Sequence, residues 1–197
     1  PMAGIDALGG ANAILSALYA HRTTLSRIRS ATAGIVSPTL NVGLIKGGIN
    51  TNVVPDQVTF RLDRRVIPEE DAAEVEAGLR ALIATCAGVS PQIKVEVRRL
   101  LLAEPLRARP GTERIAAALQ RRAKEVLGVE VPTAGVPLYT DARHYAAAGI
   151  PTVLYGAGPR SIGEANAHNA DENLRLADLR AATKIVGLAV ADLLGGR

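Results

Sequence analysis

Residues 39–62, TLNVGLIKGGINTNVVPDQVTFRL, decide how the first half of this chain folds. Apolar side chains occupy alternate positions over residues 40–44 and again over residues 58–62. A period of two is typical of strands that bury one face. The intervening residues 47–56 begin with two glycines and contain a proline and several polar side chains. We therefore predict two antiparallel strands joined by a long, polar loop.

Helical and strand patterns surround this pair of strands. Apolar residues fall near helical spacing over residues 11–25. A second helix is expected from Pro68 to just before Gly88, because proline followed by acidic residues suits a helix start. Residues 93–97 alternate again and predict a third strand. The order helix, strand, strand, helix, strand matches a ferredoxin-like α+β domain whose first strand is missing, which we assign to residues 1–101. We infer that the chain begins inside a domain.

Helices and short apolar runs alternate in the second half of the chain. Their predicted order is helix 112–127, strand 133–136, helix 140–148, strand 152–155 and helix 176–194. Such alternation indicates an open α/β sheet, of which residues 102–197 would form one half. The predicted fold class is α/β, with a truncated ferredoxin-like α+β domain followed by half of an open α/β domain.

Composition narrows the classes of function. The 197 residues are 48% hydrophobic and carry a formal charge of +4, with basic residues spread along the chain. Aromatic residues make up only 3%, which argues against the stacking surfaces of a nucleic-acid-binding protein. The apolar runs are too short for a membrane span. The single cysteine, Cys86, falls on the apolar side of a predicted helix, so we expect a reduced core residue and a cytoplasmic protein.

A glycine-rich loop at residues 156–172, GAGPRSIGEANAHNADE, follows the apolar run 152–155. Loops after buried strands often carry the chemistry of α/β folds. His168 is therefore a candidate metal ligand, with Asp171 and Glu172 as carboxylates that fix its imidazole. The alternative interpretation is a surface histidine.

Three stretches together resemble one family of metallohydrolases. They are GGINTNVVPDQVTFRLDRRVIPEE at 47–70, PLYTDARHYAAAGIPTVLYGAGP at 137–159 and AHNADE at 167–172. Their order and spacing resemble the family of acetylornithine deacetylase, succinyl-diaminopimelate desuccinylase, aminoacylase and carboxypeptidase G. The resemblance implies a ferredoxin-like lid domain, often used for dimerisation, and a catalytic α/β domain that binds two zinc ions, or alternatively cobalt.

Matching of motifs implies roles for individual residues. His168 would be a metal ligand. Asn52 would contact the substrate, although it also suits a structural turn. Thr140 would contact the substrate and cap a helix. In the loop that leads to His168, Arg160 and Ser161 would bind the substrate, with the guanidinium of Arg160 placed to bind a substrate carboxylate. Arg160 also fits an exposed position. The general base is expected upstream of Pro1, so no catalytic residue is assigned within the chain.

Other polar residues receive structural assignments. Asp63 and Arg65 suit an ion pair at a strand end, and the consecutive Glu69 and Glu70 follow Pro68 and should not be taken for the family's catalytic glutamates. His144, four residues after Thr140, could approach the site or lie at the surface, and His21 is expected to face solvent or a second subunit. The residues PLY before Thr140 replace the usual glycines of the family, which leaves the shape of the substrate pocket open.

The combined expectation is the C-terminal portion of a zinc-dependent amide hydrolase. Its substrate would be an N-acyl amino acid or a di- or short peptide, and its partner a second copy bound through the lid. Alone, the chain would be inactive, because one histidine cannot hold a catalytic zinc that needs three protein ligands. The alternative is a non-catalytic dimerisation or binding module. Neither reading involves nucleic acid or a membrane.

Overall fold

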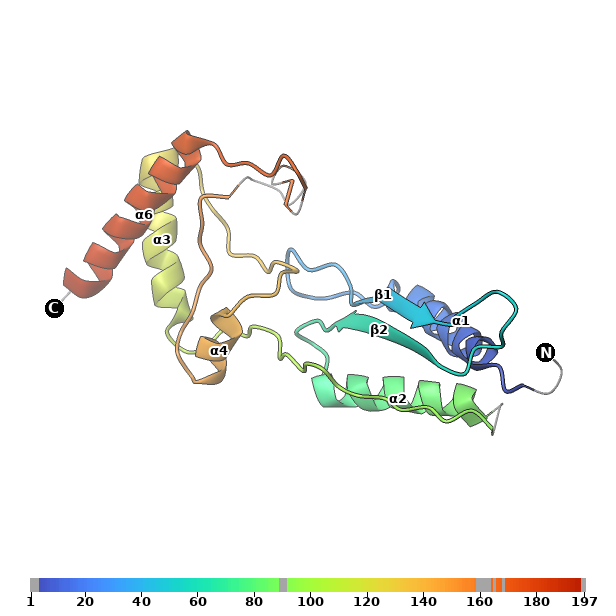
Figure 1. Cartoon of the computed structure of the whole chain (residues 1–197). Helices are drawn as coiled ribbons and strands as arrows, with labels where there is room; N and C mark the ends of the chain where they lie inside the picture. The colour runs from blue at the N-terminus through green and yellow to red at the C-terminus, as the bar shows by residue number, and fades with distance from the viewer. Residues whose placement is uncertain (1–3, 89–91, 159–163, 165, 168, 196–197) are drawn as a thin grey trace. The chain divides into compact units, whose positions relative to one another are not determined.

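The computed structural model describes residues 4–88, 92–158, 164, 166–167 and 169–195. The chain divides into two compact units. The first unit comprises Pro1–Pro105 and Gly135–Pro137, and the second comprises Leu106–Ala134 and Leu138–Arg197. Helices and a small antiparallel sheet make up the described elements, so the fold mixes α and β structure (Figure 1).

The described residues of the first unit form two strands and two helices (Figure 1). In chain order they are α1 (Ala7–Leu25), β1 (Thr39–Gly47), β2 (Val58–Arg65) and α2 (Ala72–Gly88). The strands pair antiparallel with Leu40 opposite Arg64, and a bulge between Val42 and Leu44 shifts the register. The predicted antiparallel pair and its long connecting loop are confirmed.

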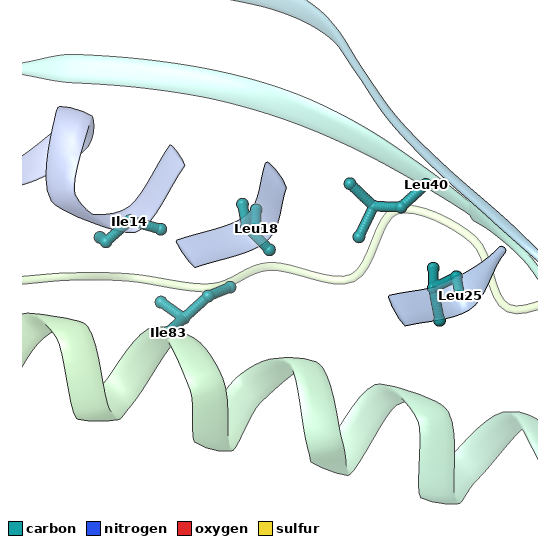
Figure 2. Packing of buried hydrophobic residues seen from close by; sticks show 5 residues of the cluster. All are labelled: Ile14, Leu18, Leu25, Leu40 and Ile83. Carbon is teal, nitrogen blue, oxygen red and sulfur yellow. The ribbon is translucent and has the colours of Figure 1, made fainter. Parts of the chain in front are cut away.

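A single apolar cluster holds these four elements together. Figure 2 shows Ile14, Leu18 and Leu25 of α1 facing Leu40 of β1 and Ile83 of α2. Leu18 is fully buried, and partly buried side chains from both strands and α2 pack around the cluster. Cys86 belongs to this surrounding layer, which confirms its prediction as a core residue.

Helix pairing dominates the described part of the second unit, in which the helices are α3 (Thr112–Leu127), α4 (Ala142–Ala147) and α6 (Leu176–Gly195). Helices α3 and α6 pack against each other, and their buried residues are mostly alanines, which allow close approach. Asp192 of α6 accepts hydrogen bonds from Arg121 and Arg122 of α3, each at 2.7 Å. Gly128 ends α3 with φ 72°, a left-handed conformation that suits glycine, so the predicted helix end is confirmed.

The predicted third strand, residues 93–97, is wrong. This segment has no strand pairing and lies along α2, because Arg80 of α2 donates to the carbonyl of Val97 at 2.8 Å and Arg99 pairs with Glu76 at 2.9 Å. An alternating pattern alone does not make a strand, because a strand also needs a neighbouring backbone with which to pair, and here Val95 and Val97 remain 40% and 37% exposed.

Residues 133–136 and 152–155 are also not strands in the part of the chain that the structure describes. Both were predicted from apolar and β-branched content, whereas a strand also requires a neighbouring backbone with which to pair. Leu154 is 44% exposed, so the run is not the buried strand that we expected.

The start of α2 also differs from the prediction. The helix begins at Ala72, not at Pro68, because the carboxylate of Asp71 accepts hydrogen bonds from the amides of Ala73 and Glu74 at 2.8 and 3.0 Å. Pro68 instead opens a turn in which the amide of Glu70 donates to Ile67 O. A capping carboxylate therefore sets the helix start in place of the proline.

No helix among the described residues is both long enough and apolar enough to cross a membrane.

Candidate functional site

Asn52 lies on the loop between β1 and β2. The base of this loop is fixed, since the amide of Ala7 donates to Pro55 O at 3.0 Å. At its tip the amide of Thr51 donates to the side-chain oxygen of Asn50 at 2.7 Å. The amide of Val53 donates to the backbone carbonyl of Asn50 at 3.2 Å. Asn50 therefore forms the turn, whereas Asn52 is exposed. The loop presents the carboxamide of Asn52 to solvent, where it can meet a ligand.

Thr140 lies in the second unit, just before α4. The prediction that Thr140 caps this helix is wrong, because the N-cap position belongs to Asp141 and no side chain bonds there. Thr140 is half-buried. The helix that follows is held in place by Arg109, whose Nε donates to Ala146 O at 2.8 Å. The substrate-contact role of Thr140 stays a prediction.

Arg143 was not predicted from the sequence, although it directly follows residues 140–142 of the quoted stretch PLYTDARHYAAAGIPTVLYGAGP. Its guanidinium lies over the ring of Tyr139, 4.6 Å from the centroid, and donates to the Tyr139 hydroxyl. Its Nε is buried without a hydrogen-bond partner among the described residues. A cation beside Thr140 would attract a substrate carboxylate. His144, one residue further on, is exposed, in agreement with the surface interpretation.

His168, Arg160 and Ser161 lie outside the described residues. The residues that flank His168 form turns: the amide of Asn169 donates to Asn166 O, and that of Glu172 donates to Asn169 O. The side-chain amide of Asn166 donates to the carboxylate of Asp171. Asn166 has φ 49°, a left-handed conformation that asparagine tolerates. Asp171 therefore has a local hydrogen-bonding role; its predicted contact with the histidine stays a prediction.

The acidic residues near the end of β2 have structural partners. Asp63 and Arg65 form an ion pair at 2.6 Å, with both side chains more than half exposed, as expected. Glu70 binds Arg64 and the amide of Ile67. These contacts confirm that Glu70 is part of the first unit's framework.

Glu69 binds the loop that precedes β1. Burial alone would raise the pKa of its carboxyl, but hydrogen bonds from Ser30, Ala31 and Thr32 outweigh this effect and lower the pKa. Glu69 is thus also a structural acid, as expected from its sequence context.

Residues 5–192 match the peptidase family M20/M25/M40. The chain belongs to this family. The match covers both units and all three motifs on which the sequence prediction depended.

Solved structures resemble this M20 family chain along most of its length. An M20 family metallo-carboxypeptidase from Sulfolobus solfataricus is 20% identical, with a TM-score of 0.58 over 91% of this chain and 43% of its own. An amidohydrolase/peptidase from Burkholderia cenocepacia, named as putative, is 22% identical, with a TM-score of 0.53 over 94% of this chain and 41% of its own. The fold is therefore shared, and the chain spans about two fifths of each structure's length.

The described residues of this M20 family chain do not by themselves fit a metal ion. Among them no group of three or more His, Cys, Asp or Glu side chains is close enough to hold one. A catalytic zinc needs three protein ligands, so the ligand set of the family is not reproduced by the described part of the chain.

Proposed function

We propose that the complete protein is a metal-dependent amide hydrolase that cleaves an N-acyl amino acid or a di- or short peptide. The family match over residues 5–192 carries this proposal. Two zinc ions, with cobalt as the alternative, are the proposed cofactors. His168 would supply one ligand, while the other ligands and the general base would come from residues outside these 197. The 197-residue chain alone would then be inactive.

Residues of this chain would bind and orient the substrate. The exposed carboxamide of Asn52 is suited to donate a hydrogen bond to a developing oxyanion or to a substrate carboxylate. Thr140, Arg160 and Ser161 would contact the substrate, and the two arginines Arg143 and Arg160 would favour a substrate with a free carboxylate. An N-acyl amino acid and a short peptide both carry such a group.

The proposed partner is a second copy of the chain, bound through the first unit. Among the described residues β1 and β2 pair only with each other, so each strand has a backbone edge that a second sheet can pair with. The half-buried thiol of Cys86 is free, which fits the proposed cytoplasmic location.

His168→Ala in the complete gene product tests the function. With zinc or cobalt present, we expect amide hydrolysis to be abolished in this variant and retained in His144→Ala, the matched control at an exposed histidine. Near-normal turnover in His168→Ala would refute the assignment.

The alternative function is a non-catalytic dimerisation or binding module. It is favoured by the missing three-ligand cluster among the described residues. Light scattering combined with the hydrolysis assay separates the two: a metal-independent dimer of the complete product without any amide hydrolysis would support the module.

A further inference from the structure

Residues 135–137 occupy an unusual place in the chain. They belong to the first unit, although the residues on both sides of them belong to the second. The amide of Gly135 donates to Ala33 O at 2.7 Å. A Cβ atom at Gly135 would lie 2.9 Å from side-chain carbons of both Ile35 and Thr32, closer than real Cβ contacts. Glycine is therefore required for this approach.

The loop that receives Gly135, residues 30–36, is closed by its own hydrogen bonds. The amide of Ser30 donates to Val36 O at 3.1 Å, and that of Ile35 donates to Thr32 O at 3.1 Å. Gly34 takes a φ of 88° at the turn. These bonds fix the carbonyl of Ala33 and the side chains around it as a preformed seat for glycine.

Glu69 also holds loop 30–36 in place, through its side-chain carboxylate. Its carboxylate accepts hydrogen bonds from the Ser30 hydroxyl at 2.9 and 3.0 Å, the Ala31 amide at 2.9 Å and the Thr32 hydroxyl at 3.2 Å. The next residue, Glu70, is bound to Arg64, whose side chain is only 7% exposed. The loop is thus connected through Glu69 to the framework of the first unit.

We propose that loop 30–36 is an anchoring seat for residues 135–137, and that Glu69 is a positioning residue that acts through this seat on the segment leading to Thr140. Only residues 136–139 separate the anchored glycine from Thr140. If loop 30–36 changes conformation, Gly135 moves with it, and so does the start of the segment that leads to Thr140. The candidate substrate contact is therefore coupled to the conformation of loop 30–36. The meaning of that coupling for catalysis rests on the function proposed above.

Amide hydrogen exchange tests the anchor directly. In Gly135→Ala we expect exchange about fivefold faster or more in residues 30–36 and also in residues 138–146, since one hydrogen bond and its packing are lost. Gly158→Ala is the matched control, because a Cβ there meets no atom within 4 Å. Faster exchange confined to residues 133–137 would overturn the proposal.

Glu69→Ala provides a second test that leaves the anchored segment unchanged. We expect faster exchange at the Gly135 amide and in residues 138–146, with Glu96→Ala, at an exposed carboxylate of the same unit, as the control. Unchanged exchange at Gly135 would refute the role of Glu69. Exchange needs neither substrate nor metal, so a failure here is distinguishable from a failure of the proposed hydrolase activity.

Discussion

Leu18→Ala probes whether the first unit depends on its single apolar cluster. Leu18 is fully buried between Ile14, Leu40 and Ile83, so truncation removes three buried carbon atoms. At about 0.8 kcal/mol for each, transfer to water costs about 2.4 kcal/mol. The cavity left behind raises the expected loss to about 3 kcal/mol or more. For a unit of this size the melting temperature should fall by about 12 °C or more.

Urea unfolding followed by circular dichroism measures this loss, with Leu8→Ala as the control. Leu8 lies on the same helix but is 49% exposed, so its truncation should cost less than about 0.5 kcal/mol. The Leu18 variant should also loosen the Asn52 loop, because α1 holds that loop through the amide of Ala7. A loss below about 1 kcal/mol for Leu18→Ala, or equal losses for both variants, would show that the cluster does not stabilise the unit as argued.

Three further predictions follow from the structure. Hydrogen bonds from two arginines of α3 lower the pKa of Asp192 below its usual 3.8. Stability from this carboxylate is therefore present above that pH and is lost as the pH falls toward the lowered pKa. Melting temperatures measured between about pH 5 and about pH 2 should depend less on pH in Asp192→Asn than in the unchanged protein, and parallel curves would contradict this. Gly47→Ala places a Cβ 2.9 Å from the backbone carbonyl oxygen of Gln57 and should lower the free energy of unfolding in urea by about 1–3 kcal/mol. Gly88→Ala is the control and should leave that free energy unchanged, because a Cβ there meets no atom within 4 Å. Asn52→Ala in the complete protein should lower kcat about 100-fold with an unchanged melting temperature, and unchanged kcat would remove Asn52 from the substrate site.

The helices could be predicted from the sequence because their signals are local. Helix α3 has the predicted bounds, since Gly128 supplies the left-handed residue that its end requires. The strands were predicted less well because pairing depends on distant residues. Residues 93–97 have an alternating pattern as clear as that of β2. They form no strand, and the carbonyl of Val97 accepts a hydrogen bond from the side chain of Arg80 in α2. Alternation in the sequence does not show whether a second backbone lies close enough to pair.

Only part of the candidate site could be predicted from the sequence, because contacts between side chains depend on how the chain folds. Asn52 lies on the polar loop 47–56 that the sequence predicts, and Asn50 makes the turn that the structural interpretation gave to Asn52. The cap of α4 was wrongly placed on Thr140, and Arg143 was missed. Tyr139 lies before α4, so its contact with the guanidinium of Arg143 depends on how the chain enters the helix and does not follow from helical spacing.

The consecutive glutamates show why side-chain partners, and not residue order, decide a catalytic role. A general base needs an oxygen that faces the attacking water and a pKa near the working pH. The oxygens of Glu69 instead accept hydrogen bonds from loop 30–36, which lower its pKa and so make it a weaker base. Glu70 is bound to Arg64 and to a backbone amide. Neither acid can take up a proton for hydrolysis without giving up the contacts that shape the first unit, so the base of the proposed hydrolase must come from other residues.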